Sequence, residues 1–180
     1  MHIALFIIGW GDDMFRWLQG FPHFLEILYD RLEVGLHPLK RWFKPGSRSE
    51  PLVIALEKIG KGAVFNCKMC GQCILHSTGM TCPLNCPKHL RNGPCGGVRP
   101  NGHCEVKPEM VCTWVDAYER SLRMPLYGHQ FASLQPPMNY QLKGTSSWIN
   151  MFHGIDVKLP DGWAKTRDIP VNFIKEDQLG

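Results

Sequence analysis

The sequence has no long hydrophobic run and none of the common catalytic motifs, and each absence excludes a class of protein. No apolar segment reaches the roughly 18 residues that would indicate a membrane-spanning helix. The apolar run over residues 3–8 lacks the basic segment and the small-residue cleavage site of a signal peptide. G-x-S-x-G, H-E-x-x-H, P-loop and G-x-G-x-x-G motifs are all missing. We therefore expect a cytoplasmic protein without a membrane span and without these catalytic or nucleotide-binding sites.

A strong excess of charge is also missing, because the 20 basic residues outnumber the 16 acidic residues by only four. The basic side chains are dispersed and are not interleaved with aromatic residues, as they would be in a groove for single-stranded nucleic acid. We therefore expect no nucleic-acid partner. With 180 residues and 44% hydrophobic content, the chain is long enough for one small domain with a modest core.

Cysteine is missing from the first 66 residues and from the last 68, and all eight cysteines lie between these segments. A secreted chain would use eight cysteines as four disulfides, whereas a cytoplasmic chain keeps thiols reduced and uses clustered cysteines to bind metal. The sequence therefore predicts that all eight are metal ligands, namely Cys67, Cys70, Cys73, Cys82, Cys86, Cys95, Cys104 and Cys112.

The spacing of the cysteines indicates which metal they hold. Cys67, Cys70 and Cys73 form a C-x2-C-x2-C pattern, which wraps three corners of one cubane in bacterial ferredoxins. Four thiolates bind either a [4Fe–4S] cluster or a zinc ion. Eight cysteines thus predict two [4Fe–4S] clusters, with zinc as the alternative at one or both sites, and the spacing leaves open which cysteines share a site. Three histidines are weaker ligand candidates, because the cysteines already suffice: His76, His89 and His103.

Residues 61–112 also carry an excess of positive charge and many glycines. Cations nearby would stabilise an anionic thiolate cluster, and six basic residues here are set against two acidic ones: Lys61, Lys68, Lys88, Arg91, Arg99 and Lys107 against Glu105 and Glu109. Glycine adopts positive φ where backbone amides turn toward sulfur, and the glycines are Gly71, Gly79, Gly93, Gly96, Gly97 and Gly102. We expect an irregular loop region here.

Three amphipathic helices are predicted around these loops. The first begins after residue 22 and has an apolar stripe that we assign to core packing: Phe24, Leu25, Leu28, Leu32 and Leu36. The second begins with Ser49 as its N-cap and ends at Gly60. The third opens at Pro108, stops at Pro125 and holds Cys112 in its first turn, where the helix dipole stabilises a thiolate.

Together these features predict a fold that is mainly α with a Cys/Gly-rich irregular metal-binding loop region, in a small single domain with an extended C-terminal arm. Residues 2–10 are predicted as a short strand or the start of a helix. Aromatic residues near them exceed what a small core needs and are expected to meet a partner protein: Trp10, Phe15, Trp17, Phe21 and Phe24. The predicted divisions are a helical segment over 1–48, the metal-binding domain over 49–125 and an arm over 126–180 that orders on a neighbour.

One stretch of the sequence resembles a known family. Residues 65–124 contain CKMCGQC, TGMTCP, CPK, RNGPCGG and GHCEV in this order, and this run resembles the C-terminal-type cysteine-rich domain of methylenetetrahydrofolate reductase. The resemblance implies a small companion subunit with iron–sulfur clusters or zinc, in which the eight cysteines are the ligands. It also implies a flavin-containing methylenetetrahydrofolate reductase subunit as partner, with ferredoxin or another protein as electron donor.

Three functional hypotheses follow. The first is a non-catalytic electron-transfer subunit, because the chain has no barrel and no flavin motif to house the reductase chemistry. The second is a redox-silent zinc scaffold that assembles or regulates a partner enzyme. The third is a methyl-transfer enzyme that activates a thiol at zinc, which requires an open coordination position.

Overall fold

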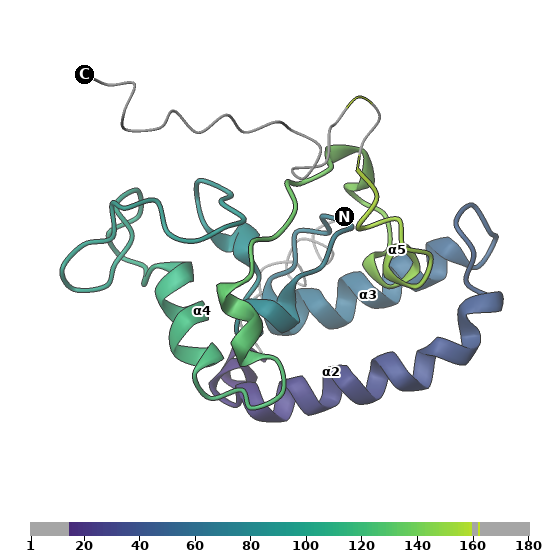
Figure 1. Cartoon of the computed structure of the whole chain (residues 1–180), viewed down its shortest axis with the longest axis horizontal. Helices are drawn as coiled ribbons and strands as arrows, with labels where there is room; N and C mark the ends of the chain where they lie inside the picture. Colours follow the sequence, from purple (N-terminus) through teal and green to yellow (C-terminus); the bar gives the residue numbers. More distant parts are fainter. Residues whose placement is uncertain (1–14, 160–161, 163–180) are drawn as a thin grey trace, which may run out of the picture.

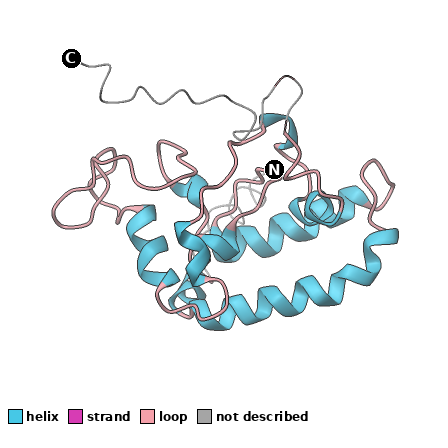
Figure 2. Cartoon of the chain, viewed as in Figure 1, coloured by secondary structure: helices cyan, strands magenta, loops and turns pink. Residues whose placement is uncertain are grey.

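The computed structural model describes residues 15–159 and 162, and helices joined by long loops make up this part of the chain (Figure 1). It contains no strand, and only His103 and Val111 pair as an isolated antiparallel bridge (Figure 2). The predicted mainly α fold with an irregular cysteine-rich region in one small domain is confirmed. In chain order the elements are η1 (Arg16–Gly20), α2 (Pro22–Leu36), η2 (His37–Arg41), α3 (Glu50–Phe65), η3 (Leu75–Ser77), η4 (Pro83–Asn85), α4 (Thr113–Ser121), η5 (Gly128–Ala132), η6 (Tyr140–Leu142) and α5 (Ser147–Phe152).

Helix α2 lies where the sequence predicts it, with Pro22 in its first turn. Leu25 and Tyr29 are buried in the main core, whose other buried members are Leu75, Met80, Cys82, Leu84 and Met124. The rest of the apolar stripe is different, because Phe24, Leu28 and Leu32 are each more than 40% exposed. The assignment of the whole stripe to core packing is therefore wrong for these three side chains, which line a groove between α2 and α3.

Helix α3 begins after Ser49 as predicted but does not end at Gly60, because it continues through Gly62 to Phe65. A glycine inside a helix costs about 1 kcal/mol relative to alanine. Packing of Val64 and Phe65 against the main core offsets that cost. The helix ends at Asn66, whose left-handed backbone (φ 50°) turns the chain into the first cysteine loop.

The third predicted helix begins later than the sequence suggests. Helix α4 starts at Thr113, and Cys112 is its N-cap instead of a first-turn residue. The backbone before it is tied to the cysteine loops, since Cys104 N–H donates to Met110 O at 3.0 Å and Cys112 N–H donates to Gly102 O at 2.9 Å. These bonds hold residues 108–112 in an extended turn, so the helix predicted from Pro108 is wrong at its start.

The C-terminal segment packs on its own chain as far as the structure describes it. Helix α5 buries Ser147, Ile149, Asn150 and Phe152 against the domain, and in Figure 1 this segment lies next to α3. Residues 126–159 therefore lie against their own domain, and the ordering of an arm on a neighbour stays a prediction. Residues 1–14, with the element predicted over 2–10, and residues 163–180 lie outside the described part. No helix within the described ranges is long and apolar enough to cross a bilayer.

Candidate metal centre

The structure divides the eight cysteines into two sets of four, which the spacing alone left open. Cys67, Cys70, Cys73 and Cys82 line one hollow, and Cys86, Cys95, Cys104 and Cys112 line a second. The two sets follow one another along the chain without interleaving. All eight thiols are free of disulfides, so each set presents four sulfur donors to one space.

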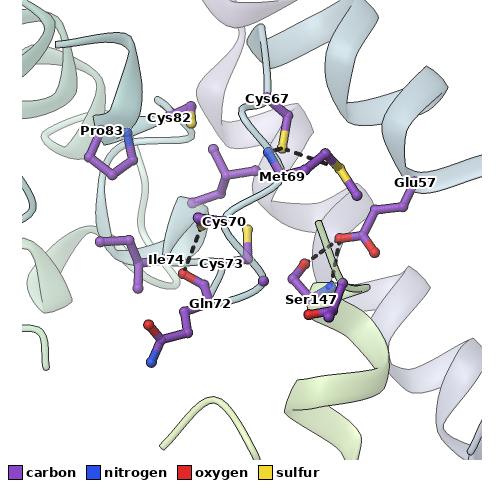
Figure 3. A pocket seen from close by; sticks show the side chains of 13 residues that line it. Glu57, Cys67, Met69, Cys70, Gln72, Cys73, Ile74, Cys82, Pro83 and Ser147 are labelled. Carbon is purple, nitrogen blue, oxygen red and sulfur yellow. Dashed lines mark hydrogen bonds between the residues drawn. The ribbon is translucent and has the colours of Figure 1, made fainter. Parts of the chain in front are cut away.

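The first site lies where α3 delivers the chain into the C-x2-C-x2-C loop (Figure 3). Backbone amides point at its sulfurs: Met69 N–H donates to Cys67 Sγ at 3.4 Å, and the N–H groups of Leu84 and Lys68 donate to Cys82. Such bonds favour the thiolate over the thiol. The loop is therefore shaped to stabilise negative charge on sulfur.

The second site is built almost entirely from loops. Cys86 follows η4 and Cys112 caps α4, and both are buried with Trp114 and Ala117 in a small cluster. Cys95 is exposed, whereas Cys104 is buried. Lys88 pairs with Glu105 across the mouth of this hollow. One corner of the second site thus faces solvent, while the other three are enclosed.

A single 3-10 turn joins the two sites. Helix η4 occupies Pro83–Asn85, with Cys82 of the first site before it and Cys86 of the second site after it. Four residue steps limit the separation of these two Cα atoms to about 14 Å. Groups bound at the two sites would therefore be held close together by the chain itself.

Burial raises the pKa of three thiols at the first site. It raises the pKa of Cys67 to about 12 and that of Cys82 to about 11, and it also raises the pKa of Cys70. At the exposed corner of the second site the backbone N–H of Gly97 lowers the pKa of Cys95, with help from Lys88. Without metal, Cys67 and Cys82 stay neutral at pH 7, so metal binding must displace their protons.

Two buried cations lie beside the first site. Lys61 Nζ donates to Glu57 Oε1 at 2.7 Å and to Ser147 Oγ at 2.6 Å. Burial alone would lower the pKa of Lys61, but Cys73 and Cys67, once they are thiolates, and the carboxylate of Glu57 raise it above its ordinary value. The ammonium is therefore protonated at all physiological pH values.

Arg91 is the second cation, and its guanidinium is held by backbone carbonyls. Nε donates to Pro136 O at 2.8 Å and Nη1 donates to Gln72 O at 3.0 Å. Burial lowers its pKa, while the nearby Cys70 and Cys73 act in the opposite direction. Sequence reasoning already placed Lys61 and Arg91 among the cations that would stabilise a cluster. It missed Glu57 and Ser147, because no local pattern connects residues 90 positions apart.

The three candidate histidines line neither hollow. The ring of His76 stacks on Tyr29, with centroids 5.6 Å apart, and meets Tyr127 edge-on. A ring nitrogen of His103 is 2.7 Å from Pro108 O, and His89 is exposed. Each hollow is thus lined by four cysteines and by no histidine.

The spacing of the donors bears on which metal fits them. Zinc binds sulfur at about 2.3 Å, which brings four tetrahedral thiolates within roughly 4 Å of one another. Within the described ranges, no three Cys, His, Asp or Glu groups lie close enough to hold a single ion. A [4Fe–4S] cluster takes one thiolate on each of four irons and so accepts donors that are further apart. Four cysteines around one hollow match the number of thiolates that either group takes.

The raised thiol pKa values predict how stability depends on pH. Cys67 and Cys82 have pKa values of about 12 and 11 in the fold, above the ordinary 9.0, so the unfolded chain loses protons first as pH rises. The metal-free chain is expected to lose stability above pH 9, on the order of 5 kcal/mol by pH 11. Urea unfolding at pH 8 and pH 11 measures this loss. The metal-loaded chain is the control, because its thiolates are already deprotonated. An equal loss of stability in both forms would show that Cys67 and Cys82 do not cause it.

Comparison with known proteins identifies the family of this sequence. No curated protein and no solved structure matches the chain. A family model described as methylene-tetrahydrofolate reductase C terminal matches residues 47–141, more than half of the 180 residues. The matched region contains α3, both four-cysteine sites and α4, and it ends within η6. The chain therefore belongs to the methylene-tetrahydrofolate reductase C-terminal family.

Proposed function

We propose that the chain is a metal-cluster-bearing accessory subunit that transfers electrons to a flavin-dependent methylenetetrahydrofolate reductase. Family membership supports the association with the reductase. The observation that carries the electron-transfer role is the division of eight cysteines into two adjacent sets of four, each around its own hollow. Two centres joined by the η4 turn suit the passage of electrons from a donor such as ferredoxin toward the flavin.

The residues of this chain have separable roles in that proposal. Iron–sulfur clusters, when bound, supply one-electron chemistry. The eight cysteines hold them, and Lys61 and Arg91 offset the negative charge of the first site, which raises its reduction potential. Hydride chemistry belongs to the flavin of the other subunit. Closed sets of four cysteines leave no open coordination position, which argues against the methyl-transfer hypothesis.

Anaerobic purification together with the reductase subunit, followed by metal analysis, tests the proposal. We expect about eight iron and eight sulfide per chain, a brown colour, and an electron paramagnetic resonance signal after reduction. Two zinc ions in a colourless chain would instead support the scaffold hypothesis, which the irregular course of residues 66–112 also favours because coordination would then supply the folding energy. A folded chain with no bound metal would contradict both.

The exposed faces of α2 and α3 supply a surface for the reductase subunit. They enclose an apolar groove of about 470 Å³. Its rim includes Phe24, Leu28 and Leu56, each more than 40% exposed. Trp17 and Phe21, which precede Phe24 in the chain, are also more than half exposed. Contiguous apolar surface of this kind marks a protein interaction site.

A charge placed in this groove is expected to break the association. Leu28→Glu combined with Leu56→Glu puts two carboxylates on the apolar rim, and loss of a central contact costs about 2 kcal/mol or more, roughly a 30-fold weaker Kd. Analytical gel filtration and calorimetry with the reductase subunit measure the effect. Leu134→Glu is the control, because Leu134 is 89% exposed and lies outside the groove. Equal binding by the groove variant and the control would remove the groove from the interface.

A further inference from the structure

Residues 139–156, here called the clasp, bind the loop that carries three ligands of the first site. Gly144 N–H donates to Met69 O and Asn150 Nδ2 donates to Gly71 O, both at 2.8 Å. Gln72 is held from two directions, because its Oε1 accepts from Asn139 N–H at 2.6 Å and its Nε2 donates to Asp156 O at 2.7 Å. The clasp thus fixes residues that separate Cys67, Cys70 and Cys73.

The clasp also packs so closely against the first cysteine loop that there is no space for a side chain at Gly71. Gly71 has φ +75°, and a Cβ at this position would collide with the carbonyl oxygen of Leu142. Thr145 and Ser147 of the clasp line the first hollow together with its cysteines. No clasp residue lines the second hollow. The contact is therefore specific to one of the two sites.

A buried polar network locks the clasp to α3. Glu57 accepts hydrogen bonds from Ser146 Oγ at 2.7 Å, from Ser147 N–H at 3.2 Å and from Ser147 Oγ. Lys61 donates to both Glu57 and Ser147. Figure 3 shows Glu57 and Ser147 pointing toward one another, away from Cys82. Unpairing any of these buried groups is costly, so the clasp is held in its closed position.

We propose that the clasp is part of the first metal site, with Asn150 as the residue that positions the ligand loop and closes the site to chelators and oxidants. This inference rests on the proposed metal-binding function. Residues 142–156 lie beyond the family match, which ends at residue 141. The clasp lies against the first hollow alone, where Cys67, Cys70 and Cys73 are only partly buried and would otherwise be more open to solvent.

Metal release from each site separately tests the clasp. Asn150→Ala is made in the full chain in two backgrounds, Cys104→Ala to leave the first site and Cys82→Ala to leave the second. Each protein is reconstituted anaerobically with iron and sulfide, and loss of visible absorption is followed after addition of EDTA. Losing the hydrogen bond to Gly71 is expected to speed release from the first site about tenfold and to leave the second site unchanged.

Two further variants separate positioning from general stability. Tyr140→Ala is the matched control, because Tyr140 belongs to the clasp but is 70% exposed. Thr145→Val is a milder change that removes the acceptor of Asn150 Nδ2, 2.7 Å away, and it serves where Asn150→Ala does not fold. Equal acceleration at both sites, or none at the first, overturns the clasp proposal while the metal-binding function stands. A chain that takes up no iron, sulfide or zinc in either background contradicts both.

Discussion

Replacing Cys82 and Cys86 one at a time is expected to empty different metal sites, although the two residues are only four positions apart. Cys82 lines the first hollow and Cys86 lines the second. Each alanine variant should lose about half of the bound metal, because a four-thiolate site that lacks one ligand no longer closes. Iron, sulfide and zinc analysis of anaerobically purified protein measures the loss.

Double variants show which site each single variant has lost. Cys73→Ala added to Cys82→Ala removes a second ligand from the same site, so no further metal should be lost. Cys104→Ala added to Cys82→Ala should remove all of it. Additive losses indicate independent sites, and non-additive losses indicate a shared one. The reverse pattern would show that the cysteines are partitioned differently.

Lys61→Met is expected to produce the largest loss of stability among single substitutions outside the cysteines. It leaves Glu57 buried without its ammonium partner, at the junction of α3 and α5. Breaking a buried ion pair by removing one partner costs about 3–5 kcal/mol, which is a large part of the 5–15 kcal/mol typical of a domain. The midpoint of urea unfolding of the metal-loaded chain measures this cost.

Two controls isolate the buried pair. Lys58→Met lies on the same helix but at an exposed position, so it should change stability by less than about 0.5 kcal/mol. Glu57→Gln added to Lys61→Met removes both charges and should recover part of the loss, because replacing both partners leaves no isolated charge. Similar midpoints for Lys61→Met and Lys58→Met would mean that the pair contributes little.

Much of the helical framework could be predicted from the sequence, since it depends on local signals. The apolar periodicity located α2, and Ser49 located the start of α3. The end of α3 could not be predicted in the same way, because tertiary packing of Val64 and Phe65 overrides the glycines at 60 and 62. The late start of α4 has a similar cause, since hydrogen bonds to distant loops hold residues before Cys112.

The candidate site was only half visible in the sequence. The eight cysteines and their C-x2-C-x2-C pattern predict metal ligands but not how these ligands are arranged in space. Metal binding itself stays a prediction. Their division into two sets depends on how irregular loops fold back, for which no periodic pattern exists. Glu57, Ser147 and Asn150 carry no motif, because their role arises only when α5 returns to the first loop.

The order of the two sites along the chain has a consequence for biosynthesis. During translation Cys82, the last thiol of the first set, leaves the ribosome before Cys86. Residues 139–156 leave the ribosome after all eight cysteines. The growing polypeptide therefore passes through a stage in which the first set is complete and still uncovered. Delivery of iron or zinc by cellular factors would be easiest in that interval, and completion of translation would end it.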